Sequence, residues 1–311
     1  MDEKNQALQP YNSDNFKITI DYLSGKIFND VIPANKTIQG TILESRKKNI
    51  VSDFWVINLT GKDIQLTEFD RAVFNICISE QAEGKKFTTA KTIFHKLGGG
   101  RDLTPTMKRA IMESVEKLAG VRIIIDSTNA IEKRIVKDGG KTKNKDGKFI
   151  LKGYLLPTES VELTLNGQEV EVIGFLKSDV TDKIKKGVIY TNAENHDQII
   201  SCTQDLLQAP VNSNPRNIAL NHYLLRRSLS IKGSNELAEK NKHVKPLCKV
   251  ILIDDMMEHC GLAEYNHDQK KKILKTTKKI LDFLIERNVI SNYQFETVKN
   301  TGKIRSIILE F

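Results

Sequence analysis

The sequence predicts an α+β fold in which two units with the same order of elements follow one another. In each unit two short apolar helices lead to a longer basic helix, and a strand, a cationic turn and a returning strand follow. The first copy runs from about Leu66 to Tyr154 and the second from about Asn214 to Phe311. This order is typical of the winged-helix domain, so we expect two such domains in tandem.

The chain has 311 residues, which exceeds one typical domain and favours two or three modules. Short alternating apolar pieces near residues 16–20 and 54–57 predict strands ahead of the first unit. The patterns divide the chain into four parts. They are an N-terminal tail with a β or mixed extension, a first winged-helix domain with a long basic hairpin arm, a connector, and a second winged-helix domain, at residues 1–65, 66–175, 176–213 and 214–311.

Capping signals mark the helices of the first unit. Thr67 followed by Asp70 resembles a capping box, and Thr104-Pro105 places a capping residue before a proline at the first helical position. The helix between them must stop at the three glycines of residues 98–100. Apolar residues at helical spacing predict the buried stripe of the third helix: Met107, Ile111, Val115 and Leu118.

Two hairpins are predicted after the third helix. Residues 132–152 hold eight Lys or Arg against three acids, and their glycines predict a turn-rich hairpin arm that follows the strand at 121–125. Residues 161–172 form the second hairpin around Asn166-Gly167, the strongest two-residue hairpin signal. In that register Leu163 faces Val170 and Val161 faces Val172.

The second unit repeats the order with shorter connections. Its first helix starts at Asn214-Pro215 and is expected to end at Lys232-Gly233, and a short helix follows at 253–260. The long basic helix is predicted from about Asn266 to Asn288, with Leu274, Thr277, Leu281 and Leu284 facing inward. Strands at 290–298 and 303–310 close the chain.

Basic residues in both units are the candidates for DNA contact, because a helix fits the major groove and lysines attract phosphates. The plainer alternative for each group is a solvated surface, and for the arm a disordered loop. The candidate DNA-binding residues are Thr106, Lys108, Arg109, Lys133, Arg134, Lys141, Lys143, Lys145, Lys270, Lys271, Lys272, Lys275, Lys278, Lys279, Lys299, Lys303 and Arg305.

Other classes of protein lack their sequence signals. The net charge of +9 favours a polyanionic partner, and no apolar run or signal peptide points to a membrane, so a cytoplasmic protein is expected. Four widely spaced cysteines fit neither a disulfide framework nor a zinc site. Gly140-Lys141-Thr142 lacks the remaining glycine of a phosphate loop, and Asp254-Asp255 fits a helix start better than a metal site. We therefore expect no enzyme, no catalytic residues, no metal and no cofactor.

Three stretches resemble the replication initiator (Rep) proteins of plasmids and mobile elements in Gram-positive bacteria. They are LTEFDRAVFNICISE, GKKFTTAKTIFHKLGGG and LTPTMKRAIMESVEKLAG of the first unit, and HYLLRRSL at 222–229 adds to the likeness. The resemblance implies two tandem winged-helix domains with a pseudo-two-fold relation, which bind origin repeats and open the adjacent duplex with host replication proteins. It places the origin-reading helix at Asp268–Arg287 and implies a homodimer that represses its own gene. The basic arm at 132–152 departs from the family's pattern.

The sequence thus predicts a sequence-specific initiator that binds double-stranded origin DNA without covalent chemistry. A winged-helix transcriptional regulator of a mobile element would share every residue-level feature. A nucleic-acid-processing enzyme is the second alternative, and metal-dependent cleavage or synthesis on a duplex would establish it.

Overall fold

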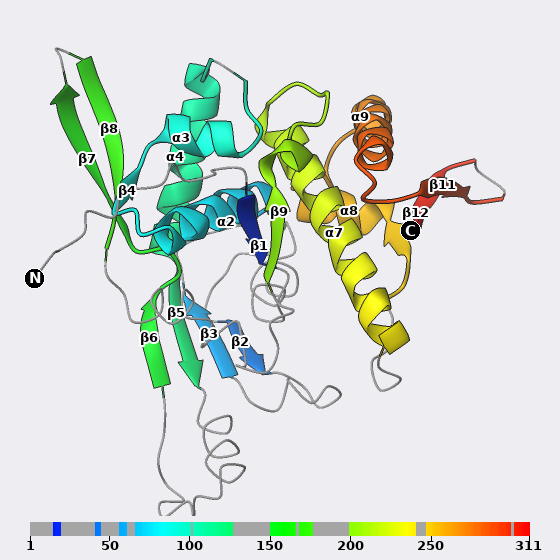
Figure 1. Cartoon of the computed structure of the whole chain (residues 1–311), viewed down its shortest axis with the longest axis horizontal. Helices are drawn as coiled ribbons and strands as arrows, with labels where there is room; N and C mark the ends of the chain where they lie inside the picture. Colours follow the sequence, from blue (N-terminus) through cyan, green and yellow to red (C-terminus); the bar gives the residue numbers. More distant parts are fainter. Residues whose placement is uncertain are drawn as a thin grey trace, which may run out of the picture.

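The computed structural model describes ten ranges of the chain. They are residues 15–19, 41–44, 56–60, 66–100, 102–126, 150–165, 168–176, 199–240, 247–299 and 302–311. Across these ranges the chain forms six α-helices and four small antiparallel sheets, which confirms the α+β class (Figure 1).

Two units with the same order of elements stand side by side in Figure 1. The first unit comprises α2 (Glu68–Ala82), β4 (Phe87–Thr88), α3 (Ala90–Lys96), α4 (Pro105–Gly120), β7 (Thr158–Leu165) and β8 (Gln168–Phe175). The second unit comprises α7 (Pro215–Lys240), β10 (Val250–Leu252), α8 (Ile253–His259), α9 (His267–Glu286), β11 (Asn292–Thr297) and β12 (Ile304–Glu310). In both units the first strand pairs with the last, since the sheet orders are β4-β8-β7 and β10-β12-β11. The repeat therefore extends to sheet topology.

A second sheet interrupts the first unit between α4 and β7. Strands β5 (Arg122–Asp126) and β6 (Ile150–Tyr154) pair with each other, and β5 also pairs with β3 (Val56–Thr60), which pairs with β2 (Thr41–Glu44). The predicted strand before the arm and the returning strand after it do pair with each other. The hairpin that pairs with β4, however, is β7–β8, whereas β5 and β6 belong to a different sheet.

The remaining strands link distant parts of the chain. β1 (Asn15–Thr19) pairs with β9 (Ile199–Thr203), which leads into the short 3-10 helix η3 (Gln204–Leu207). The N-terminal strands thus pair both with the first unit's inserted sheet and with the segment before α7. The division of the chain into domains stays a prediction.

Local signals located the helix starts and one hairpin correctly. Thr67 and Asp70 form the expected capping box on α2, and the side chain of Thr104 accepts a hydrogen bond from the backbone N–H of Met107. Asn214 caps α7 through the backbone N–H of Asn217 at 2.9 Å. The β7–β8 register is confirmed, with Val161 opposite Val172 and Leu163 opposite Val170.

Helix α7 is longer than the sequence predicted. It continues through Lys232-Gly233 to Lys240, so the predicted end is wrong. A glycine inside a helix costs only about 0.5–1 kcal/mol relative to alanine. Burial of Leu224, Leu225 and Ile231 on the same helix offsets such a cost.

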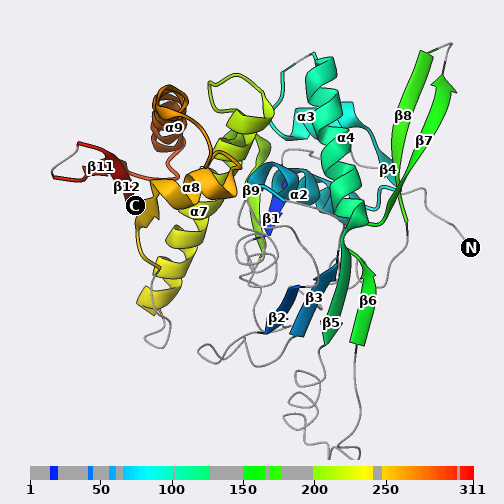
Figure 2. The same cartoon turned by 180° about the vertical axis from the view of Figure 1, so that it is seen from behind.

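The core is centred on α2, which packs against α4 of its own unit and against α7 of the second (Figure 2). Phe74 and Ile76 are fully buried on different sides of this helix, and Cys77 is also buried. Because α2 is covered on several sides, the two units share one continuous apolar cluster. None of the described helices is long and apolar enough to cross a membrane.

Candidate nucleic-acid interface

The sequence specifies α9 by its cap and its apolar stripe. Asn266 and Gln269 form a capping box, with each side chain accepting from the other residue's backbone N–H at 2.9–3.0 Å. Ile273, Ile280 and Leu284 are fully buried, whereas Leu274 is only half-buried. The buried face of α9 is thus rotated slightly about the helix axis from the predicted one, and the opposite face is exposed to solvent.

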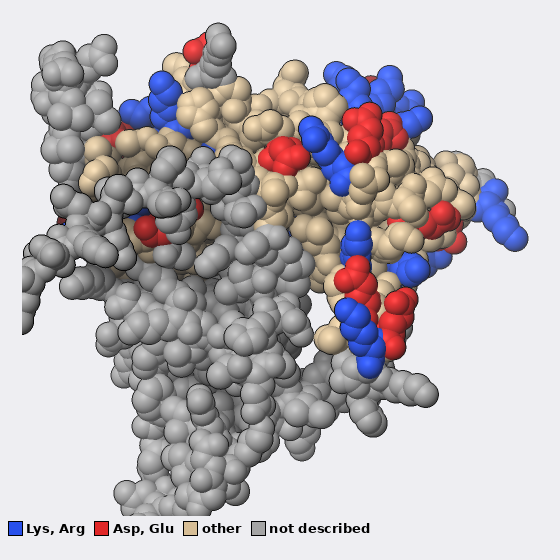
Figure 3. Space-filling model, in the orientation of Figure 1, with Lys and Arg blue, Asp and Glu red and all other residues tan. Residues whose placement is uncertain are grey.

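Lysines cover the outward face of α9. Lys271, Lys272, Lys275, Lys278 and Lys279 are exposed, and Lys270 is half-buried. Among the described residues none of these six ammonium groups makes an ion pair. Figure 3 shows blue side chains gathered over this helix. We call the five exposed lysines the lysine face.

Lys275 lies at the centre of the lysine face. On a helix the nearest surface neighbours are three and four residues away, and for Lys275 all four of these positions hold lysine: 271, 272, 278 and 279. Each like-charge pair destabilises a helix by about 0.2–0.5 kcal/mol. The lysine face therefore costs folding stability, and a bound polyanion would remove that cost.

The hairpin of the second unit adds three exposed cations, Lys299, Lys303 and Arg305. Lys303 lies 3.9 Å from the carboxylate of Asp254, in the first turn of α8, where both side chains are mostly in solvent. An exposed pair of this kind contributes little to the folding free energy.

The third helix of the first unit is less basic. Thr106, Lys108 and Arg109 are exposed in its first two turns, as predicted for contact residues. The ammonium group of Lys108, however, lies 3.0 Å from a carboxylate oxygen of Glu171 on β8. Part of the predicted cationic surface is thus neutralised by the unit's own hairpin.

The β7–β8 hairpin itself is acidic. Residues 158–175 contain four glutamates and neither Lys nor Arg. The register places Glu162 directly opposite Glu171, an arrangement that disfavours pairing of the strands. This hairpin lacks the charge for phosphate contact. Five other candidates, Lys133, Arg134, Lys141, Lys143 and Lys145, lie in the arm, outside the described residues.

A buried charged cluster joins the two units. Glu68 at the start of α2 accepts two hydrogen bonds from the guanidinium of Arg226 on α7, at 2.8 and 3.0 Å. The same carboxylate lies 2.7 Å from Nδ1 of His222, whose Nε2 lies 3.1 Å from the side-chain amide of Asn75. Sequence patterns gave no signal for this cluster, because its members lie up to 158 positions apart.

The hydrogen bonds define the charge states in the cluster. Because the Asn75 amide donates to Nε2, His222 is neutral and carries its proton on Nδ1, where it donates to Glu68. Burial lowers the pKa of His222 below its ordinary value. The carboxyl of Glu68 keeps a pKa well below its ordinary value, because the attraction of Arg226 and the bond from His222 outweigh its burial. The cluster is therefore a neutral histidine beside an ionised Glu–Arg pair.

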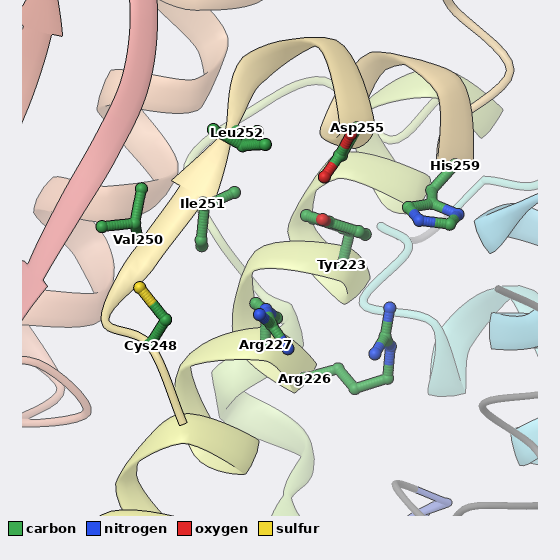
Figure 4. A pocket seen from close by; sticks show the side chains of 9 residues that line it. All are labelled: Tyr223, Arg226, Arg227, Cys248, Val250, Ile251, Leu252, Asp255 and His259. Atoms are coloured by element: carbon green, nitrogen blue, oxygen red, sulfur yellow. The ribbon is translucent and has the colours of Figure 1, made fainter. Parts of the chain in front are cut away.

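A cavity of about 400 Å³ lies beside this cluster, in the second unit (Figure 4). Helix α7, strand β10, helix α8 and a cysteine two positions before β10 line it: Tyr223, Arg226, Arg227, Cys248, Val250, Ile251, Leu252, Asp255 and His259. The Tyr223 ring stacks on the His259 ring. The guanidinium carbon of Arg226 lies 5.3 Å from the centre of the Tyr223 ring. No lining residue comes from α9, so this cavity is separate from the lysine face. The described residues hold no group of His, Cys, Asp and Glu that could bind a metal ion.

Two crystal structures of domains 2 and 3 of RctB are similar to this chain. The selenomethionine derivative shares 11% identity at a TM-score of 0.41, covering 92% of this chain and 96% of that one. The structure of RctB residues 155–483 shares 9% identity at a TM-score of 0.45, covering 92% and 97%. No protein-family model matches the chain, and no curated protein matches its sequence. The interface described above rests on the residues of this chain.

Proposed function

We propose that this chain is a sequence-specific, double-stranded DNA-binding replication initiator of a plasmid or mobile element. It would bind origin repeats through two tandem winged-helix domains and promote opening of the adjacent duplex. The observation that carries the proposal is the lysine face, which places five exposed lysines on one helix, none of them in an ion pair with any residue that the structure describes.

The position of these lysines favours a nucleic acid over a generally solvated surface. α9 is the third helix of its unit and precedes a hairpin with three exposed cations, Lys299, Lys303 and Arg305. In helix-turn-helix proteins the helix at this position enters the major groove, and its flanking elements touch the backbone. Lysines at the centre of such a helix neutralise phosphates.

Both units could meet one duplex. In Figures 1 and 2 the lysine-bearing α9 and the N-terminal end of α4 lie on the same, upper side of the molecule. The Glu68–Arg226 contact fixes the first helices of the two units against each other. A rigid pair of domains suits repeated origin sequences, and host replication proteins and a second copy of the chain would be the further partners.

Duplex binding at several salt concentrations tests the proposal. Each phosphate contact contributes about 0.9 to the slope of log affinity against log salt, so K271A/K275A should lower the slope by about 1.8. K86A/K240A removes the same charge from exposed positions outside α9 and should leave the slope unchanged. A flat salt response of the parent protein would rule out the DNA interface.

The same interface would serve a winged-helix regulator that represses its own gene. Plasmid maintenance separates the two functions, because an initiator supports replication of a plasmid that carries the bound repeats. A regulator would bind the repeats without supporting replication.

A further inference from the structure

The outward faces of the two third helices differ in chemistry. Every exposed residue of α9 between positions 270 and 280 is a lysine. The first three turns of α4 instead expose a mixture of side-chain groups: the hydroxyl of Thr106, the ammonium group of Lys108, the guanidinium of Arg109 and the carboxylate of Glu113.

Arg109 is an exposed cation near the N-terminal end of α4. Lys108 is paired with Glu171, and among the described residues Arg109 makes no ion pair. A guanidinium presents a fixed fork of donors that matches the O6 and N7 acceptors of guanine, which an ammonium group cannot match. It also lies in the first two turns, the part of such a helix that reaches base edges.

Acidic side chains flank Arg109 on the same side of the helix. Glu113 and Glu116 follow it by four and seven positions, and both are exposed. Neither makes an ion pair among the described residues, although Glu113 follows Arg109 by four positions, a spacing at which opposite charges on a helix can pair. Carboxylates beside a groove-binding arginine repel phosphates, so they penalise every complex in which Arg109 merely touches the backbone.

We infer that Arg109 selects the DNA sequence and that Glu113 and Glu116 sharpen this selection, whereas the lysine face of α9 holds duplex of any sequence. The inference rests on the proposed function and adds a division of labour to it. It reverses the roles that the resemblance implied, since sequence reading moves from α9 to α4.

The test uses the full chain and two duplexes, one obtained by selection from random sequences and one scrambled version of it. R109K keeps the charge and loses the fork, so affinity for the selected duplex should fall roughly 10-fold or more while affinity for the scrambled duplex stays unchanged. E113Q/E116Q should raise affinity for the scrambled duplex several-fold and so reduce the preference. K275Q should lower the affinity for both duplexes by the same factor.

Each outcome separates the inference from the proposed function. A parent protein that binds no duplex contradicts the function. A parent that prefers the selected duplex, with R109K keeping the full preference, overturns the inference and leaves the function intact. The altered side chains are exposed, so thermal midpoints equal to the parent's will show that a lost preference is not a folding defect.

Discussion

The two units share an order of elements and a sheet topology but carry opposite charge on their hairpins. The β7–β8 hairpin of the first unit has four glutamates and no cation. The β11–β12 hairpin, residues 292–310, has three cations and two acids. The buried positions define the fold of each unit, whereas the exposed positions define what it binds. Repetition of a fold therefore does not imply repetition of a contact.

The third helices show the same contrast. On α9 neighbouring lysines repel one another, whereas α4 carries charges of both signs and one of its lysines is paired with the hairpin. This difference matters for DNA only if the two helices are held in a fixed relation. The buried cluster of Glu68, His222 and Arg226 provides that relation, since it ties α2 of one unit to α7 of the other.

Glu68→Gln should have the largest effect. It leaves the buried guanidinium of Arg226 without a counter-charge, and breaking a buried ion pair in this way costs about 3–5 kcal/mol of unfolding free energy. Chemical denaturation followed by circular dichroism measures the loss. Because the cluster joins the two units, the variant should still unfold in a single transition, with its midpoint at a lower denaturant concentration.

Two variants make the result specific to the cluster. Glu116→Gln, at an exposed position, should change stability by less than about 0.5 kcal/mol. The double variant Glu68→Gln/Arg226→Met should lose less unfolding free energy than the two single variants added together. With both side chains replaced, no buried charge is left without its partner. Additive losses, or a biphasic transition in which only one unit melts, would mean that the units are not coupled through this contact.

Stability should also fall as the pH drops below about 6.5. The pKa of His222 is lowered by burial, so below its ordinary value of 6.5 the unfolded chain binds a proton that the folded chain does not. His259, whose pKa burial also lowers, adds to this loss. One such proton changes the unfolding free energy by at most about 1.4 kcal/mol per pH unit.

The pH dependence has a matching variant. His222→Gln should flatten the decline between about pH 7 and 5.5 and leave only the part due to His259. Below about pH 4.5 Glu68, with its lowered pKa, adds a further loss, and Asp70, whose pKa is raised by burial, opposes it. An equally steep decline in the variant would contradict the role given to His222.

The sequence predicted what depends on neighbours in the chain. The caps at Thr67, Thr104 and Asn214 and the two-residue hairpin signal at positions 166–167 depend on a few neighbouring residues, so the local sequence predicts them. The buried Glu68–His222 contact depends on the packing of α2 against α7, and no local rule indicates it. The choice of hairpin that pairs with β4 is also not a local property, because it depends on β5 pairing with the distant strand β3 and on β4 pairing with β8.

The candidate site was predicted in composition but not in pairing. All five exposed lysines of α9 were identified, since a helical period separates them from the buried stripe. The sequence did not predict the ion pair between Lys108 and Glu171, because these residues are 63 positions apart and meet only where β8 lies beside α4. The charge pattern of the sequence therefore overestimated the number of unpaired cations on the first unit.

Lys275→Gln gives the smallest and sharpest contrast between the units. It removes four like-charge pairs from α9, and because Gln and Lys have similar helix propensity, unfolding free energy should rise by roughly 1 kcal/mol at low salt. On α4, Lys117→Gln should lower stability, because Lys117 follows Glu113 by four positions and attracts the buried carboxylate of Asp70. Near 1 M salt, where screening acts within about 3 Å, the gain in unfolding free energy at position 275 should vanish.

The same variant should bind DNA more weakly, so stability and affinity move in opposite directions. Loss of stability in Lys275→Gln would contradict the repulsion among these lysines.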